Sequence, residues 1–299
     1  MHQTQSTLAC SVGIAAYNEE ENIGRLLERL LHQKLSCCEI KEIIVLASGC
    51  TDNTEAIVRK FTSSDARINL VVQPCREGKA SAINLFLRHA HSDILVIESA
   101  DTLPEPTTIQ RLIEPFRDPE VGMTGAHPVP VNDPHTLMGF AAQALWELHH
   151  QIALHHPKMG ELTAFRRIFY RIPKSSATDE ASMEALIRGQ GYRLCYVPGA
   201  IVHNRGPATV SDYLKQRRRI SAGHLRLKHE QGYIVSTMRG GRILAEMPHL
   251  LRLGWRCMWI PCVVALEVYG RFLGWLDFHY KKRDHAVWDI AATTKRSIG

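Results

Sequence analysis

One carboxylate in this sequence stands where proteins often place a ligand for a cation. Asp101 follows the apolar run at residues 94–97 and precedes Thr102-Leu103-Pro104, so we expect it at the exit of a buried strand. Hard divalent cations that hold a diphosphate bind oxygen ligands of this kind. An aspartate before a proline can equally cap a turn, so Asp101 alone leaves both interpretations open.

A glycine-bearing turn earlier in the chain is suited to a strand-to-helix connection beside a ligand. Residues 48–54 read SGCTDNT, in which Gly49 permits close approach of another backbone segment. Asp52 or Thr51 can cap the helix that follows. Taken alone, this turn carries little information about function.

A second turn carries cations at the start of a helical pattern. Residues 76–84 read REGKASAIN, and Arg76 and Lys79 stand where a phosphate would meet the unpaired N–H groups of a helix start. Solvated surface charge is the alternative for both side chains.

The elements that must position these residues follow one repeated pattern from residue 8 to about residue 98: an apolar run, a polar turn, then a helical pattern. This alternation predicts an α/β fold with a parallel sheet. Predicted strands cover residues 9–15, 42–47, 68–73 and 93–97, and predicted helices cover 21–33, 53–61 and 79–89. Ligands bind beyond the carboxyl ends of such strands. Those ends carry residues 17–20, 48–52, 76–79 and 99–102.

Composition excludes several classes of protein. The chain has 299 residues, of which 45% are hydrophobic and 22% charged, so it is neither a disulfide miniprotein nor a fibrous or disordered chain. Its eight cysteines form no C-x-x-C pair, which favours reduced thiols in a reducing compartment. The first ten residues do not resemble a secretory signal.

The C-terminal region is first basic and then apolar. Residues 215–256 hold ten lysines and arginines against Glu230 and Glu246, and the apolar run 258–276 contains Pro261, Glu267 and Arg271. A charge at mid-bilayer costs about 2.5–3.5 kcal/mol on insertion scales, so we expect an interfacial or buried helix instead of a span. A basic region beside tryptophans and an apolar helix suits an anionic membrane surface.

Taken together, these residues resemble glycosyltransferase family 2, whose members have a GT-A fold and transfer a sugar from a nucleotide donor with inversion. The resemblance runs from about Ser11 to Gly223. It rests on YNEE at residues 17–20, GCTD at 49–52 for the family's GSTD, Gly78-Lys79 with Asn84, and SAD at 99–101 for its metal-binding DxD. The resemblance implies donor contacts at Tyr17, Asn18, Glu19, Ser48, Asp52, Arg76, Lys79, Ser99 and Asp101.

The resemblance also implies a catalytic base. Asp179-Glu180, before the helical pattern at 181–188, resembles the family's E-D motif. The spacing to Gly191 favours Glu180 as the base, while the residue type favours Asp179.

Two further segments resemble family motifs that contact the diphosphate or the acceptor. Residues 216–220, QRRRI, resemble the Q-x-x-R-W motif of membrane-associated members, and residues 160–167 resemble a glycine-to-arginine acceptor segment. The side chains so implied are Gln216, Arg218, Arg219 and Arg166. Ile220 replaces the tryptophan, which argues against a processive polysaccharide synthase.

The metal-binding motif departs from the family pattern. Ser99 replaces its first aspartate, so Asp101 must hold a Mg²⁺ or Mn²⁺ ion with diphosphate oxygens, water and His203 as a candidate ligand. We therefore expect weak cation binding, with metal independence as the alternative. Ala47 and Ser48 replace the aspartates that read a uracil ring, which leaves the donor base open.

The sequence thus predicts a GT-A catalytic domain over residues 1–210, with a nucleotide-sugar half at 1–101 and an acceptor half at 102–210. Residues 211–299 are expected to form membrane-associating helices. The expected function in glycan biosynthesis is inverting transfer of a sugar from a nucleotide sugar to a lipid, lipid-linked or saccharide acceptor, at the cytoplasmic face of a membrane.

Two other functions compete with this one. The replacement at Ser99 motivates a catalytically silent GT-A-like binding or scaffold protein. The net charge of +6 motivates a nucleic-acid-binding protein, but no RNA-binding motif is present and the basic region ends in an apolar helix. We therefore expect no nucleic-acid partner.

Overall fold

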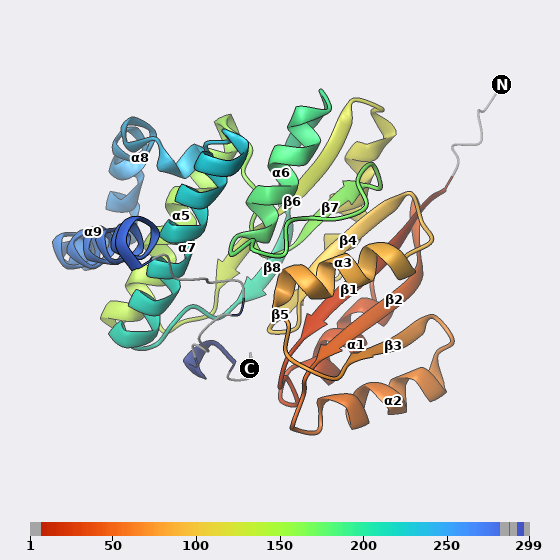
Figure 1. The fold of residues 1–299 in the computed structure, drawn as a ribbon. Helices are drawn as coiled ribbons and strands as arrows, with labels where there is room; N and C mark the ends of the chain where they lie inside the picture. Colours follow the sequence, from red (N-terminus) through yellow and green to blue (C-terminus); the bar gives the residue numbers. More distant parts are fainter. Residues whose placement is uncertain (1–6, 282–286, 288–291, 296–299) are drawn as a thin grey trace.

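The computed structural model describes residues 7–281, 287 and 292–295. Its centre is an eight-stranded sheet with the order β3-β2-β1-β4-β7-β6-β8-β5 (Figure 1). The strands are β1 (Leu8–Ala16), β2 (Cys38–Ser48), β3 (Ile68–Gln73), β4 (Ile94–Ser99), β5 (Thr102–Pro104), β6 (Val121–Pro130), β7 (Thr163–Arg166) and β8 (Arg193–Asn204). The first four are parallel, as predicted. β7 runs antiparallel to β4 and β6, and β8 runs parallel to β6.

The predicted strands and helices of the first half are confirmed, with shifted ends. The helices are α1 (Ile23–Leu31), α2 (Thr54–Ser64) and α3 (Lys79–His89). β2 begins at Cys38, earlier than predicted, because Cys38 and Ile40 are buried and pair with Leu8 and Cys10 of β1. Polar residues 39 and 41 interrupt the apolar run there, which hid this part of the strand from the sequence pattern.

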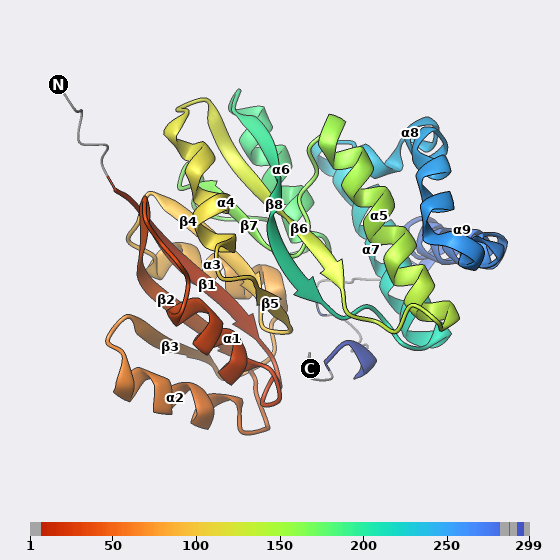
Figure 2. The same ribbon diagram turned by 180° about the vertical axis from the view of Figure 1, so that it is seen from behind.

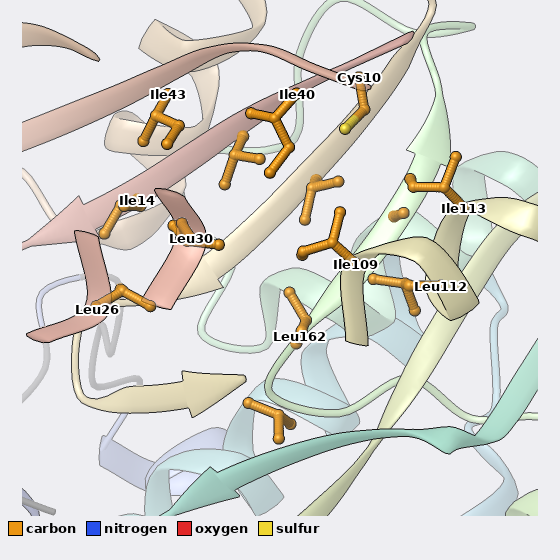
Figure 3. Close-up of a cluster of buried hydrophobic side chains, with 14 of the residues drawn as sticks. Cys10, Ile14, Leu26, Leu30, Ile40, Ile43, Ile109, Leu112, Ile113 and Leu162 are labelled. Atoms are coloured by element: carbon orange, nitrogen blue, oxygen red, sulfur yellow. The ribbon is translucent and has the colours of Figure 1, made fainter. Parts of the chain in front are cut away.

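Helices cover both faces of the sheet. Along β2, Ile43 and Val45 join a cluster with α1, α2 and α4 (Thr108–Ile113), part of which is shown in Figure 3. The alternate residues Ile44 and Leu46 pack on the other face with α3 and α6 (Asp179–Gly189). A strand buried on both faces must be apolar at consecutive positions. The two clusters fix the strand ends, and with them the loops that follow.

The second half of the chain mixes strands and helices. Its long helices are α5 (Leu137–His155) and α7 (Val210–Gln231), and α7 begins where the predicted catalytic domain ends. Shorter helical segments are η1 (Glu114–Arg117), η2 (Ser236–Met238), η4 (Asp277–Lys281) and η5 (Ala292–Lys295). The predicted boundary between a catalytic domain (1–210) and a C-terminal region (211–299) stays a prediction. α5, before this boundary, and the C-terminal helices, after it, share one apolar cluster.

The C-terminal helices stack outside α5 and α7, away from the sheet (Figures 1 and 2). They are α8 (Gly240–Glu246), η3 (Met247–Trp259) and α9 (Ile260–Leu276). Their inner faces contribute Leu250 and Val263 to the cluster around Phe140 and Tyr213. By length and composition the helical run Gly240–Lys281 could cross a membrane, and 17% of its most apolar window is buried.

Charged residues of the apolar helix are paired inside the protein. Glu267 of α9 accepts hydrogen bonds from Nη2 of Arg217 in α7 at 2.8 Å and from Nε of Arg271 at 2.7 Å. Although burial opposes the charge, these two arginines lower the pKa of Glu267 to about 2. Asp277, fully buried after α9, accepts from Nη2 of Arg218 at 2.5 Å. α9 is therefore fastened to the helix that carries the predicted QRRRI motif.

Candidate active site

A cavity of about 330 Å³ opens at the carboxyl ends of β1, β2 and β4. This is where a parallel sheet is expected to bind a ligand. The predicted donor residues that line it are Tyr17, Glu19, Ser48, Arg76, Lys79, Ser99 and Asp101. The loops after four separate strands thus converge on one space, as the sequence indicated.

Two predicted donor residues, Asn18 and Asp52, instead fasten the loops to each other. Asn18 accepts from the N–H of Thr51 at 2.8 Å, and Asp52 accepts from the N–H of Glu20 at 3.1 Å. Asp52, one residue before the N-cap Asn53, also accepts from the N–H of Thr54, the first residue of α2, at 3.0 Å. Both side chains lie outside the cavity lining formed by the described residues. In this structure the two side chains hold the loops together, and their direct contact with a donor stays a prediction.

Gly49 lets the loops after β2 and β3 meet closely. It has φ +65°, and a Cβ atom at this position would lie 2.6 Å from the backbone nitrogen of Arg76. A side chain here would displace that loop. The close approach places the Arg76 guanidinium 4.3 Å from the centre of the Tyr17 ring, where a cation–π contact forms.

Lys79 connects the donor side of the cavity to α6. Its Nζ donates to Glu180 Oε1 at 2.8 Å and to Ser99 Oγ at 3.2 Å. Burial opposes the charge, but the carboxylates of Glu180 and Asp179 outweigh it and raise the pKa of Lys79. A fixed cation therefore stands between the strand ends and the predicted base.

The two candidate bases differ in environment. Glu180 lines the cavity, and although burial opposes ionisation, Lys79 lowers its pKa. Asp179 is fully buried and does not belong to the described cavity lining, and neither carboxylate oxygen has a hydrogen-bond partner among the described residues. Burial raises the pKa of Asp179 to about 7. Only a carboxylate that faces the cavity can accept a proton from a bound molecule, so the geometry favours Glu180.

Asp101 is the candidate cation ligand, and the described residues around it do not complete a metal site. Burial raises its pKa, against the opposing effect of Lys79 and Lys295. Among the described residues, no group of three or more His, Cys, Asp or Glu side chains is placed to hold a metal ion. A single carboxylate suits a cation that takes its other ligands from a diphosphate and water. It does not suit a metal site that the protein completes by itself.

The motif helix α7 presents its polar face to the cavity. Gln216, Arg218 and Arg219 line it, as the resemblance implied. Arg219 donates to the carbonyl of Ala177 at 2.7 Å, while Arg217 points to Glu267 of α9. Arg219 of α7 thus faces the cavity, whereas Arg217 of the same helix contacts α9.

Two predicted residues are placed elsewhere. Arg166 stands opposite Ile94, at the amino end of β4, and its guanidinium donates to the carbonyls of Val121, Phe116 and Asp118. It is therefore a structural residue and not a diphosphate or acceptor contact. His203 lies outside the described cavity lining, and its Nε2 is 3.3 Å from Glu105, so this placement does not support the predicted metal ligation.

Several lining residues escaped the sequence analysis. Lys158 and Glu161 flank Gly160, within or beside the segment that resembled an acceptor motif, and both line the cavity. Burial, followed by the charge of Asp101, raises the pKa of Glu161 to about 7. Lys295 reaches the cavity from the C-terminal end of the chain and contacts Glu19 at 2.7 Å. No local pattern marks such a residue, because its partners are far away in the sequence.

Comparison with known proteins gives a consistent picture. The sequence profile described as Glycosyl transferase family 2 matches residues 11–184. Poly-beta-1,6-N-acetyl-D-glucosamine synthase from Staphylococcus aureus (strain COL) is 28% identical over 222 residues, covering 70% of this chain and 53% of that protein. The counterpart from Staphylococcus epidermidis is 22% identical over 298 residues, covering 95% and 71%. The chain thus spans about half the length of the first of these relatives.

Solved structures share the fold. The mannosyltransferase PcManGT from Pyrobaculum calidifontis, in complex with GDP-Man and Mn²⁺, superposes with a TM-score of 0.64 at 19% identity, covering 92% of this chain and 88% of that one. Glucosyl-3-phosphoglycerate synthase from Mycobacterium tuberculosis gives 0.52 at 19% identity, covering 75% and 80%. The predicted GT-A fold is therefore confirmed.

Proposed function

Because this chain belongs to glycosyl transferase family 2, we propose that it transfers a sugar from a nucleoside-diphosphate donor to an acceptor hydroxyl, with inversion at the anomeric carbon. The observation that carries the proposal is the convergence of Lys79, Asp101 and Glu180 on one cavity. Such a transfer needs a positive group near the leaving diphosphate, a carboxylate that can hold a metal ion, and a general base.

Glu180 is the proposed general base. Its lowered pKa keeps it ionised at neutral pH, so it can take the proton of an acceptor hydroxyl as the oxygen attacks the sugar. Lys79 holds its Oε1 atom at 2.8 Å and so fixes the carboxylate. A base that acts as the leaving group departs requires no covalent sugar intermediate, which is consistent with inversion.

The cations that line the cavity are proposed to stabilise the leaving diphosphate. Lys79, Arg218 and Arg219 line the cavity, and buried Asp277 orients the guanidinium of Arg218. Fixed positive groups aimed at developing charge are an effective form of catalysis in a water-poor site. A Mg²⁺ or Mn²⁺ ion at Asp101 would neutralise part of that charge when bound.

Gly49→Ala offers a test of the donor site. The added methyl group would meet the backbone of Arg76, so we expect weaker binding of UDP or GDP as well as lower stability. Gly191→Ala is the matched control, because Gly191 also has positive φ (+87°) but no atom within 4 Å of the added Cβ. Backbone strain costs about 1–3 kcal/mol in either variant. Isothermal titration should show weaker nucleotide binding only for Gly49→Ala, and equal affinities would contradict the proposed role of this turn.

We further propose that the acceptor is lipid or lipid-linked and that the protein is peripheral on a membrane. The support is a set of exposed apolar side chains on η3 and α9, called here the apolar surface: Leu251, Trp255, Met258, Val268, Tyr269 and Phe272. Exposed apolar patches of this kind commonly mark membrane or protein contacts. α9 packs directly on α7, so this surface lies one helix away from the cavity.

Flotation with anionic liposomes tests the membrane proposal. Basic residues contribute about 1 kcal/mol each near such a surface and are screened by salt, whereas buried apolar side chains are not. Flotation should therefore weaken without vanishing as salt rises. Truncation after Gly232, or Met258→Asp with Val268→Asp in the full chain, should release the protein. Unchanged flotation of the folded double variant would contradict this surface as the membrane contact.

Activity itself is tested by release of nucleoside diphosphate from a panel of UDP- and GDP-sugars in the presence of Mn²⁺ and a lipid extract. We expect release with at least one donor, and release that is about 10²- to 10⁴-fold slower from Glu180→Gln. Binding of a nucleotide without any turnover would instead favour the silent GT-A-like binding protein.

A further inference from the structure

The C-terminal segment η5 lies in the cavity beside the residues that the donor is proposed to use. Lys295 donates from Nζ to the carbonyl of Tyr17, to that of Asn18 at 3.2 Å and to Glu19 Oε1 at 2.7 Å. The same ammonium group is 5.1 Å from the centre of the Tyr17 ring. Thr294 and Lys295 both line the cavity, so a molecule that fills this end must meet the segment.

Polar contacts hold the segment across the mouth of the cavity. On one side the Thr293 hydroxyl donates to Asp212 of α7 at 2.8 Å and accepts from the N–H of Ala208 at 3.1 Å. On the other side Asn22, before α1, donates to the carbonyl of Lys295 at 2.8 Å. The segment therefore bridges α7 and the loop after β1.

This attachment is polar and buries no apolar side chain of residues 293–295. The side chains of Thr293, Thr294 and Lys295 are only half-buried, and none belongs to an apolar cluster of the described chain. Water can replace these hydrogen bonds when the segment leaves, so the net loss is small for each neutral bond and larger for the bonds to the carboxylates of Glu19 and Asp212. Firmly docked segments in this protein, such as α9, instead bury apolar side chains.

We propose that η5 is an autoinhibitory strap that occupies the nucleoside end of the donor site and must leave before a nucleotide binds. Lys295 satisfies the Glu19 carboxylate and covers the Tyr17 ring, so it competes for the groups that would meet the nucleoside. The apparent affinity for nucleotide is then reduced by the fraction of molecules in which the strap is closed. The inference rests on the proposed donor site.

The test is titration of the full-length protein with UDP and with GDP, each with Mn²⁺. Lys295→Ala should tighten nucleotide binding about tenfold, the amount by which a strap closed in nine molecules of ten reduces affinity. Thr293→Val, which keeps the lysine but loses the bond to Asp212, should shift affinity in the same direction. Lys41→Ala, which removes an exposed lysine that pairs with Glu39, is the matched control and should leave affinity unchanged.

The direction of the change separates a strap from a ligand-binding lysine. Removal of a cation that served the anionic nucleotide would weaken binding, so tighter binding is opposite to the simple electrostatic effect. Weaker or equal binding by Lys295→Ala overturns the strap. If neither the wild-type protein nor Lys295→Ala binds either nucleotide, the donor site itself fails, and the strap with it.

Discussion

Glu180→Gln is expected to lower turnover by about 10²- to 10⁴-fold, the usual cost of losing a general base. The amide keeps the shape of the side chain but cannot accept the acceptor proton. The acidic limb of the pH–rate profile provides a second readout. The pKa of Glu180 is lowered from 4.5, so activity should fall only as the pH drops below that value, and the variant should lose this limb. Turnover of a matched sugar donor at several pH values measures both effects.

Asp179→Asn is the control for this prediction. Burial raises the pKa of Asp179 to about 7, so the neutral acid already predominates below neutral pH and an amide imitates it. We expect a much smaller loss of turnover than for Glu180→Gln. The raised pKa also means that ionised Asp179 destabilises the fold as the pH rises toward 7, so the variant should flatten that decline in thermal stability. A larger loss at Asp179 than at Glu180 would reverse the assignment of the base.

Asp101→Ala is expected to abolish cation-dependent turnover, with a loss of about 10³-fold or more if the cation supplies several kcal/mol to the leaving diphosphate. Ser99 offers a hydroxyl and no charge, so it cannot replace the missing carboxylate. Activity measured across a Mn²⁺ titration, with chelator as the zero point, gives the result. Full activity of the variant in chelator would contradict the role of Asp101 as the metal ligand.

Ser99→Asp provides the reciprocal experiment. It restores the aspartate that the family motif carries at this position and should lower the Mn²⁺ concentration needed for half-maximal turnover. The added carboxylate also faces Lys79, whose Nζ lies 3.2 Å from the Ser99 hydroxyl, so it has a cation to neutralise it. An unchanged Mn²⁺ requirement would mean that residue 99 is not oriented toward the cation.

The parallel half of the fold was predictable because its apolar runs are local. β4 and α3 follow directly from the alternation of apolar and polar residues, and the loops after each strand must then converge at one edge of the sheet. That convergence was enough to gather Tyr17, Lys79 and Asp101. The choice between Asp179 and Glu180 was not predictable, because it depends on which side of the first turn of α6 faces the cavity.

Other residues were misplaced or missed for physical reasons. Arg166 ends a strand that runs antiparallel to β4, so it lies at the opposite edge of the sheet from the cavity, and strand direction is not encoded in a four-residue segment. Asn18 and Asp52 have the right type for a donor contact but satisfy backbone N–H groups of the neighbouring loop. Lys295 is separated from Glu19 by 276 residues, so only the folded chain brings them together.

The central claim is that the cavity at the carboxyl ends of β1, β2 and β4 binds a nucleoside-diphosphate donor. Its most direct test is a crystal structure of the protein grown with UDP or GDP and Mn²⁺. We predict electron density for a nucleoside diphosphate that contacts Tyr17, Ser48 and Lys79 and ends at Asp101. Nucleotide density bound elsewhere on the protein, with none in this cavity, would contradict the claim.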